Sequence, residues 1–458
     1  MKNSTKNPLT PWKDKILFTP GPLTTSPTVK QAMLRDLGSR DTAFIEVVRD
    51  VRNRLLDIAQ VTKGEYECVI MQGSGTFGIE AVISSAFPQF EYEDFEDIFG
   101  DFNDDAIPDD EDDDEDDDEF DDDEDDDDDD DAEALNQPLR VLDSTDDSDD
   151  DDEEDDDDDD DGDLDDDDSG GKLLVLINGA YGRRILSIAE LHGIDCAGLV
   201  YDENEPVDCA SVKDFLDEDP SITHVMVVHC ETTTGIINDV TTLGKIVHAA
   251  GRRFMVDSMS AFGGVPLNVG EAEIDFLISS SNKCIEGVPG FSFVIARSDA
   301  LKECEGQART LVLDLYAQWE GLEKDGQFRF TPPTHSLLAF HQALLELQNE
   351  GGVEARAARY SANHDFVIKG MRALGFKAFL PDNLQGHIIT SFYYPNHPKF
   401  DFSDFYSRLN SKGYVIYPGK VSNAACFRIG HIGRMDTNDA RDLLAAVRDT
   451  MDEMGMKL

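Results

Sequence analysis

The chain has 458 residues, more than a single hydrophobic core usually holds, so two domains around one site are expected. Its formal net charge is −59, but the segment from Glu91 to Asp168 alone holds 52 of the 98 acidic residues and one, Arg140, of the 39 basic ones. The remainder has a net charge of −8, which is ordinary for a soluble enzyme and gives no reason to expect a nucleic-acid partner.

Cysteine usage and the N-terminal sequence narrow the class of protein further. The seven cysteines are scattered without a CxxC pair, which indicates neither a disulfide framework nor a zinc cluster, so no metal site is expected. The opening sequence MKNSTKNPLTPWKDK lacks the apolar core of a signal peptide, and no run of about 18 apolar residues occurs. We therefore expect a cytoplasmic protein without a membrane span.

Residues 1–90 are expected to form an N-terminal arm and the first part of a large domain. The arm contains the proline-rich stretch LFTPGPLTTSP. Apolar residues then recur at helical spacing from Val29 to Ile58, and an apolar strand follows from Cys68 to Met71.

Residues 91–170 form an acidic, low-complexity insertion. The segment is nearly all Asp with almost nothing to bury, so we expect it to be disordered and extended. Because the cost of closing a loop grows slowly with its length, such an insertion need not prevent folding. It is either an inert tether or a segment that binds cations or basic proteins.

Residues 171–335 are expected to complete the large domain, and residues 336–458 to form a smaller α+β domain. Near-continuous apolar strands separated by helical patterns predict an α/β fold with a mostly parallel sheet covered on both faces. The expected strands of this part are Leu173–Ile177, Gly198–Tyr201, His224–Val228, Phe254–Val256 and Phe276–Ile278. The small domain adds strand-like runs in HIITSFYYP and GYVIYPG.

Two charged residues mark ends of predicted strands in the large domain. Lys283 lies on a glycine- and proline-broken turn between the runs Ile274–Ile278 and Phe291–Ala296, where it is either a surface charge or a functional amine. Asp257 ends a buried strand, where an acid is either a helix cap or an active-site group, since open α/β sheets bind ligands at the carboxyl ends of their strands.

A glycine-rich turn follows another strand, in VIMQGSGTFGIEAVI. Ser74, Gly75 and Thr76 would present backbone N–H groups and hydroxyls at a helix N-terminus, which suits a phosphate, although plain helix capping has the same pattern. A phosphate cradle, a carboxylate and a lysine together are what pyridoxal 5'-phosphate requires. The lysine must lose its proton to act, which a partly desolvated turn favours.

The motifs together resemble the class V aminotransferases, a family of fold-type I enzymes that use pyridoxal 5'-phosphate. The resemblance rests on NGAYG from Asn178, HCETTTG from His229, and the motifs VDSMSAFGG and SSSNKCIEGVPG, with 26 positions between Asp257 and Lys283. It extends to TPGPL, RFTPPTH and VIYPGKVSNAACFRIGHIG, and so covers nearly the whole chain outside the insertion.

The resemblance implies roles for the residues at these positions. Lys283 would form the Schiff base with the cofactor and later move a proton, while Asp257 would pair with the pyridinium nitrogen. Tyr181 would lie where an aromatic ring stacks on the cofactor, and Thr232 would bond near its ring oxygen. The residues expected at the cofactor phosphate are Ser74, Gly75 and Thr76, with Asn282 nearby and Thr331 supplied by the partner subunit of a homodimer.

Arg428 would receive the anionic end of the substrate. From its own surroundings, between Phe427 and Ile429, it is either the partner of a buried acid or a fork for an anion, and the resemblance favours the fork. Additional groups expected to help with a dianion are Arg183, Arg184 and the pair Thr24 and Thr25. For His229, Cys230 and Cys284 we expect packing rather than chemistry.

Within the family, the chain resembles the branch that transfers the amine of 2-aminoethylphosphonate to pyruvate, giving phosphonoacetaldehyde and L-alanine. A serine- or alanine-glyoxylate aminotransferase is the nearest alternative. A cysteine desulfurase fits less well, because that relative has a histidine directly before its lysine and Asn282 stands here. A different class of alternative is an acidic binding module on an inactive aminotransferase core.

Overall fold

The structure is a computed structural model that describes residues 14–88, 170–419 and 421–457. The acidic insertion predicted at 91–170 lies outside these residues, except for Gly170. Within the described ranges, no helix is both long and apolar enough to cross a membrane.

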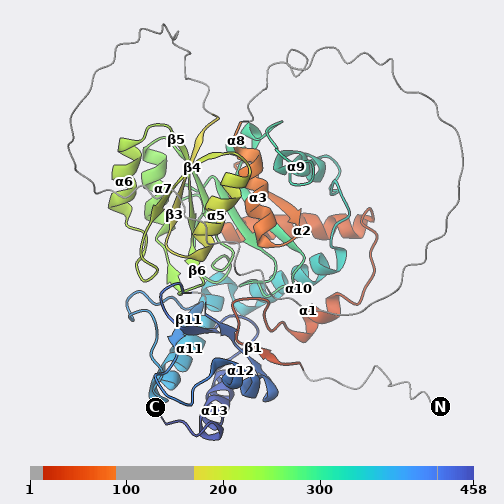
Figure 1. Cartoon of the computed structure of the whole chain (residues 1–458). Helices are drawn as coiled ribbons and strands as arrows, with labels where there is room; N and C mark the ends of the chain where they lie inside the picture. Colours follow the sequence, from red (N-terminus) through yellow and green to blue (C-terminus); the bar gives the residue numbers. More distant parts are fainter. Residues whose placement is uncertain (1–13, 89–169, 420, 458) are drawn as a thin grey trace, which may run out of the picture. The chain divides into compact units, whose positions relative to one another are not determined.

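A seven-stranded sheet forms the centre of the fold (Figure 1). Its strand order is β2-β10-β9-β8-β5-β3-β4. The strands from β9 to β4 are parallel to one another, whereas β10 is antiparallel to both β9 and β2. The bounds are Tyr66–Gln72 for β2, Lys172–Ile177 for β3, Asp195–Val200 for β4, Ile222–Val228 for β5, Arg253–Asp257 for β8, Phe276–Ser280 for β9 and Phe291–Arg297 for β10. The predicted mostly parallel sheet is therefore confirmed, with one antiparallel strand that the sequence did not indicate.

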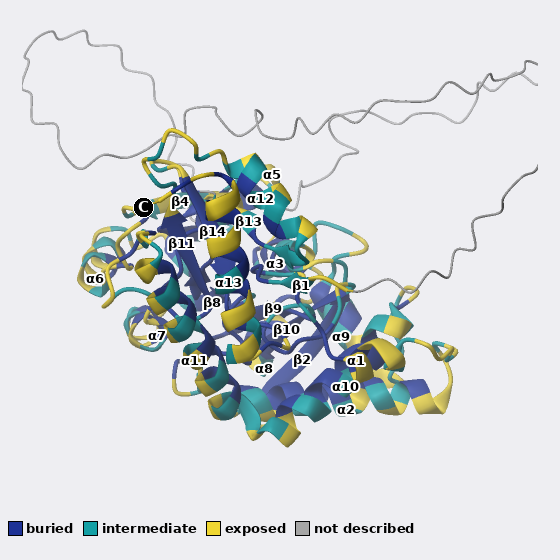
Figure 2. Cartoon of the chain, turned by 90° about the horizontal axis from the view of Figure 1, so that it is seen from below, coloured by how far each residue is buried: buried dark blue, intermediate teal, exposed yellow. Residues whose placement is uncertain are grey.

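The apolar runs that predicted these strands are buried along almost their whole length. Every residue of β9 is buried, as are all but one residue of β2, β3, β8 and β10, which requires protein on both faces of the sheet (Figure 2). The edge strand β4 has only exposed and partly buried residues. The helices that pack directly on the strands include α2 (Thr42–Ala59), α3 (Gly75–Ala86), α5 (Ala180–Leu191) and α7 (Val240–Ala249).

Further helices and a short hairpin complete this part of the chain. They are α6 (Cys209–Glu218), β6 (Cys230–Glu231), β7 (Ile236–Ile237), α8 (Ser298–Glu303), α9 (Leu315–Lys324) and α10 (Thr334–Glu350). The hairpin pairs β6 with β7 directly after β5, so the chain turns back at the carboxyl end of that strand.

The helical pattern from Val29 to Ile58 does not form one helix. It divides into α1 (Pro27–Ala32) and α2, with a break between them. Gly38 N–H donates to a carboxylate oxygen of Asp41 at 2.9 Å, and Asp41 is the residue that precedes α2. A local bond from an Asp side chain to a nearby backbone N–H competes with helix formation, which accounts for the break.

A second, three-stranded sheet lies in the C-terminal part, with the order β11-β14-β13. Helices pack against it around a separate apolar core that contains Phe392, Phe427 and Leu443. The elements are α11 (Gly352–Ala373), β11 (Ile389–Tyr393), α12 (Phe402–Ser411), β12 (Tyr414–Val415), β13 (Tyr417–Pro418), β14 (Cys426–Gly430) and α13 (Thr437–Glu453). A third, smaller cluster of buried apolar residues includes Leu23, Ala261 and Ile432. The division into a large and a small domain, with a boundary near residue 335, stays a prediction.

The run GYVIYPG forms two short strands instead of one. Tyr414 and Val415 pair in parallel with β1 (Ile16–Leu17), while Tyr417 and Pro418 pair with β14. Ile416 lies between them and is fully buried. The N-terminal arm thus adds a strand to the C-terminal part of the chain, a long-range pairing with no local sequence signal.

Candidate active site

A cavity of about 210 Å³ opens at the carboxyl ends of β5, β8 and β9. Strand ends gather here because β5, β8 and β9 are parallel, and β2 runs in the same direction beyond the antiparallel β10. The lining residues are Ser74, Gly75, Thr76, Ile79, Tyr181, Arg184, Val228, Cys230, Thr232, Asp257, Met259, Ser260, Ser280, Asn282 and Lys283. Every cofactor-binding residue expected from the sequence is among them, except Thr331.

The N-terminus of α3 forms one wall of this cavity. Gly73 has a φ of 101°, a left-handed conformation that favours glycine, and it turns the chain from β2 into the helix. Ser74 is the N-cap residue, and its hydroxyl does not take up the usual capping bond. A Cβ on Gly75 would lie 2.3 Å from Sδ of Met259, so a larger residue there would have to displace the Met259 side chain. The first turn of α3 therefore faces the cavity with backbone N–H groups that suit an anion.

Lys283 lies on the connection between β9 and β10, as the sequence predicted. Its Nζ donates to the carbonyl oxygen of Pro20 at 2.9 Å, which brings the N-terminal arm into contact with the site. Desolvation by the surrounding protein lowers the pKa of Lys283, although Tyr181, Cys284 and Asp257 oppose that shift. A lowered pKa makes the neutral amine more accessible, which a nucleophilic lysine requires.

Asp257 ends β8 and is almost fully buried. Its Oδ1 accepts a hydrogen bond of 2.9 Å from the backbone N–H of Met259. Burial raises the pKa of Asp257 to about 6, despite the opposing effects of that bond and of Lys283 and Arg184. A buried carboxylate of this kind gains from a positively charged partner on the open side of the cavity.

Tyr181 begins the first turn of α5 and interacts with several polar groups. Burial raises the pKa of its phenol, but Lys283, a hydrogen bond with Thr232 and the charge of Arg428 outweigh burial and leave the pKa lowered. The guanidinium of Arg184 lies 5.3 Å from the centre of the Tyr181 ring. These contacts hold an aromatic ring at the wall of the cavity.

Arg428 lies behind the cavity on β14 and is 2% exposed. Its Nε donates to the carbonyl oxygen of Pro418 at 2.9 Å, and Nη1 donates to that of Thr232 at 3.0 Å. Among the residues that the structure describes, Arg428 forms no salt bridge with an acid. The structure therefore does not show Arg428 as the partner of a buried acid, which was one of its two interpretations. The anion fork remains.

Several residues considered from the sequence lie away from the cavity. Thr331 lines a different depression, formed by residues 39–40 and 327–332, and its carbonyl accepts a bond of 3.2 Å from Gln72. Arg183 and Arg184 are both exposed, but only Arg184 lines the cavity. Thr24 accepts a bond from the N–H of Leu17, which fixes the arm.

His229 packs as expected, since its Nδ1 lies 3.0 Å from the hydroxyl of Ser258 and burial lowers its pKa to about 4. Cys284 is fully buried, whereas Cys230 is buried and also contributes to the cavity wall. Burial raises the pKa of both thiols, to about 12 for Cys284. Both thiols are therefore poor nucleophiles at neutral pH.

Two residues at the site were given no role from the sequence. Met259 covers Gly75 and lines the cavity, and the only signal for it was its position two residues after Asp257. Glu231 is completely buried beside the site, where its carboxylate accepts bonds from the N–H of Tyr181 at 3.3 Å and from the hydroxyl of Thr233 at 2.7 Å. Burial raises the pKa of Glu231 to about 7.

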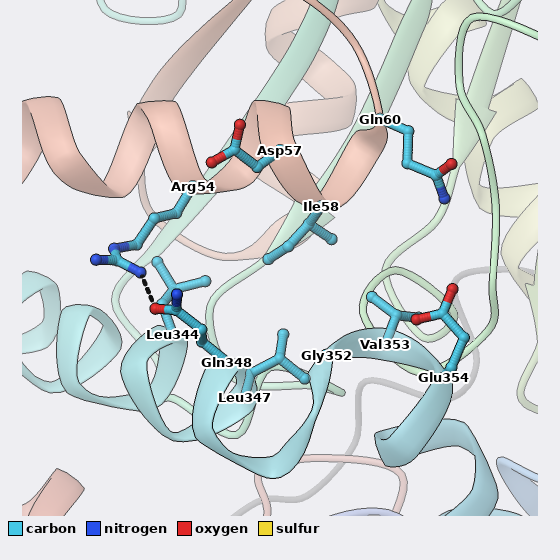
Figure 3. Close-up of a pocket in the computed structure, with 10 residues that line it drawn as sticks. All are labelled: Arg54, Asp57, Ile58, Gln60, Leu344, Leu347, Gln348, Gly352, Val353 and Glu354. Atoms are coloured by element: carbon cyan, nitrogen blue, oxygen red, sulfur yellow. Dashed lines mark hydrogen bonds between the residues drawn. The ribbon is translucent and has the colours of Figure 1, made fainter.

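A second cavity, of about 330 Å³, lies where α2 approaches α10 and the start of α11 (Figure 3). Arg54 crosses its edge and donates a bond of 2.7 Å to Gln348. The residues around it are Arg54, Asp57, Ile58, Gln60, Leu344, Leu347, Gln348, Gly352, Val353 and Glu354. None of the predicted site residues lines it, so the smaller cavity at the strand ends is the candidate active site.

Comparison with known proteins defines the class of this enzyme. The family model "Aminotransferase class-V" matches residues 173–429. The chain belongs to the class V aminotransferase family, whose members depend on pyridoxal 5'-phosphate. Solved structures agree in fold: pyridoxamine-pyruvate aminotransferase from Mesorhizobium loti has a TM-score of 0.73 at 21% identity, with 97% of this chain and 94% of that one covered. Alanine–glyoxylate aminotransferase from Nostoc sp. has a TM-score of 0.72 at 19% identity, with 98% and 99% covered.

Relatives with higher sequence identity share one enzyme name. The 2-aminoethylphosphonate–pyruvate transaminase of Syntrophobacter fumaroxidans is 42% identical over 441 residues, with 96% of this chain and 97% of the relative covered. The transaminase of the same name from Vibrio cholerae is 41% identical over 435 residues, with 94% and 96% covered. The predicted fold-type I architecture and the predicted family are confirmed.

Proposed function

We propose that this chain transfers the amine of 2-aminoethylphosphonate to pyruvate, giving phosphonoacetaldehyde and L-alanine, with pyridoxal 5'-phosphate as cofactor. The observation that carries the proposal is the single cavity onto which Lys283, Asp257 and the N-terminus of α3 open. The relatives of this function match almost the full length of both chains, which supports the choice of substrates.

The residues present fit the cofactor. Gly75 has no side chain, which leaves room for a phosphate at the N-terminus of α3. The backbone N–H groups and hydroxyls of Ser74, Gly75 and Thr76 would donate hydrogen bonds to it. Asp257 would pair with the pyridinium nitrogen, which supplies the positive partner that its buried carboxylate favours. When bound, the cofactor supplies an aldehyde that captures the amine and a ring that spreads negative charge from the neighbouring carbon.

The chain's own groups would then hold and move protons. Lys283 is the base within reach of the cavity, and its lowered pKa favours the neutral amine that accepts a proton from the carbon bearing nitrogen. Tyr181 and Thr232, which also line the cavity, would orient the cofactor ring. The exchange needs no external oxidant, because the phosphonate substrate is converted to an aldehyde while pyruvate is converted to an amine.

A dianionic phosphonate requires more than one positive group. Arg428 provides a buried guanidinium beside Thr232, and Arg184 on the cavity wall is the additional cation that we assign to the substrate. Arg183 does not line the cavity, so we assign it no contact with the substrate.

The expected homodimer also belongs to this proposal. Thr331 lies outside the cavity of its own chain and would bind the cofactor phosphate of the partner subunit. Phe77 and Phe330 are 48% and 41% exposed, and a subunit interface would cover these rings. The cytoplasmic location stays a prediction from the sequence.

The test combines purified protein and pyridoxal 5'-phosphate with 2-aminoethylphosphonate and pyruvate, while alanine and phosphonoacetaldehyde are measured together. Equal amounts of the two products support the proposal, and Lys283→Ala should abolish both. The control reactions use serine or alanine with glyoxylate. Turnover in these reactions alone would keep the family and the cofactor but would show that the assignment of substrates is wrong.

A further inference from the structure

A buried cluster of charged side chains lies directly behind the Lys283 turn. It contains two arginines and two glutamates, so its charges balance, and a tyrosine lies among them. Its members are Glu286, Glu350, Arg356, Arg359 and Tyr360. Arg356 and Tyr360 have no exposed surface, and Glu286 is 2% exposed. Breaking a buried pair of this kind is costly, because the remaining charge loses its partner.

One side of the cluster holds the backbone of the Lys283 turn. The carbonyl oxygen of Cys284 accepts bonds from Nη1 of Arg356 at 2.6 Å and from the hydroxyl of Tyr360 at 3.1 Å. The N–H of Glu286 donates to the carbonyl of Lys283 at 2.8 Å. Glu286 has a φ of 67°, an unfavourable conformation for a residue with a side chain, which persists only where the surroundings hold it.

The other side of the cluster holds the segment that follows β14. Arg359 is the residue that joins the two sides. Its Nη2 lies 2.7 Å from Oε1 of Glu286, while Nη1 donates to the carbonyls of Gly433 at 2.6 Å and Met435 at 3.1 Å. These carbonyls lie shortly after Arg428, whose strand ends at residue 430. The guanidinium of Arg359 therefore contacts both the segment that carries Lys283 and the segment that follows Arg428.

We propose that Arg359 is a positioning residue that sets the separation between the amine of Lys283 and the guanidinium of Arg428, and thereby selects the chain length of the aminoalkyl anion. This inference rests on the proposed function, since it assigns Arg428 to the anionic end of the substrate. A substrate whose amine is captured by the cofactor beside Lys283, and whose anion is bound by Arg428, must match the separation between these two positions. A misplacement of about 1 Å between reacting groups costs on the order of 100-fold in rate.

If the distance between Lys283 and Arg428 is fixed, no additional contact is needed to select against substrates with a longer or shorter carbon chain. One methylene in an apolar pocket discriminates by only about 10- to 200-fold. A fixed anion site excludes both shorter and longer molecules, because either the amine or the anion then lacks its partner. Loss of Arg359 would allow the two segments to adjust to each other, so longer and shorter substrates would be accepted more evenly.

The experiment compares aminomethylphosphonate, 2-aminoethylphosphonate and 3-aminopropylphosphonate as amine donors to pyruvate, using the full chain with pyridoxal 5'-phosphate. The variant is Arg359→Gln. Its matched control is Arg372→Gln on the same helix, where the arginine is 42% exposed and pairs with Asp382. We expect the ratio of kcat/KM for the two-carbon over the three-carbon donor to fall at least about 10-fold in Arg359→Gln and to stay constant in Arg372→Gln.

Hydrogen–deuterium exchange without substrate supplies a readout other than activity. Arg359→Gln should speed exchange both in residues 281–287 and in residues 431–436, whereas Glu286→Gln should do so in the first segment only. If Arg359→Gln does not fold, Arg359→Lys replaces it, because an ammonium keeps the charge and cannot reach all of the partners.

An unchanged chain-length ratio in a folded Arg359 variant overturns the proposal, as does faster exchange in one segment alone. Failure of the wild-type chain to use 2-aminoethylphosphonate would instead contradict the proposed function. In that case the exchange measurement still decides whether Arg359 couples the two segments.

Discussion

Gly430 ends β14 of the C-terminal sheet and contacts the N-terminal arm, which reaches Lys283 through Pro20. We expect Gly430→Ala to damage the sheet, the arm and the active site. The N–H of Gly430 donates to the carbonyl of Phe18 at 2.9 Å. A Cβ at this position would lie 2.3 Å from the carbonyl oxygen of Thr19, while ordinary contact begins at 3.4 Å. The arm must therefore retreat by about 1.1 Å, which is the difference between these two distances.

This displacement has two calculable effects. Overpacking in a buried region costs about 1–3 kcal/mol of the free energy of unfolding. Pro20, the next residue after Thr19, accepts the hydrogen bond from Lys283, so the surroundings of the reactive amine shift with the arm. A misplacement of about 1 Å corresponds to a loss of roughly 100-fold in kcat/KM.

The measurements are urea unfolding and the rate of alanine formation from 2-aminoethylphosphonate and pyruvate. Gly270→Ala is the matched control, because a Cβ there would meet Asn268 at 3.5 Å and Val61 at 3.7 Å, which are ordinary contacts. If Gly430→Ala kept the stability and the rate of Gly270→Ala, the argument from the arm contact would be refuted.

Three further predictions concern charge. Asp257→Asn should lower kcat about 10- to 100-fold, because a charged hydrogen bond contributes about 1.5–3 kcal/mol. Stopped-flow turnover measures this change, and an unchanged kcat would contradict the pairing of Asp257 with the pyridinium nitrogen. Arg428→Lys should raise KM for 2-aminoethylphosphonate about 10-fold or more, since a single ammonium does not replace a planar fork, and initial-rate kinetics at fixed pyruvate would measure it; an unchanged KM would place the anion elsewhere. Burial lowers the pKa of His224 from 6.5 to about 3. As the pH falls, the imidazole is therefore protonated in the unfolded chain before it is protonated in the folded state. Stability should consequently fall as the pH drops from 6.5 towards 3, by about 1.4 kcal/mol per pH unit from this residue, and His224→Gln should flatten that slope in urea unfolding at pH 6 and 5; an equal slope in both proteins contradicts the assignment.

Local patterns predicted the groups that lie at strand ends. Lys283, Asp257 and the turn at Ser74 were found because each combines an apolar strand with a short polar or glycine-containing break, and parallel strands bring such breaks to one edge of the sheet. The antiparallel direction of β10 was not predicted, since a buried strand has the same apolar composition in either direction.

Contacts between distant segments had no such signal. The pairing of Ile16 with Tyr414 and the bonds of Arg359 depend on the tertiary arrangement of residues far apart in the chain. The break between α1 and α2 was missed for a different reason. The apolar spacing continues across it, whereas the bond from Gly38 N–H to the Asp41 side chain favours a non-helical backbone.

The parallel pairing of β1 with β12 has a consequence for biosynthesis. Residues 16–17 leave the ribosome long before their partners at 414–415 are made. Domains begin to fold during synthesis, so the seven-stranded sheet can assemble while the arm is still unattached. Pro20 can be held in place beside Lys283 only after β12 and β14 exist. We therefore expect a nascent chain truncated before residue 414 to contain the central sheet and to lack a competent active site.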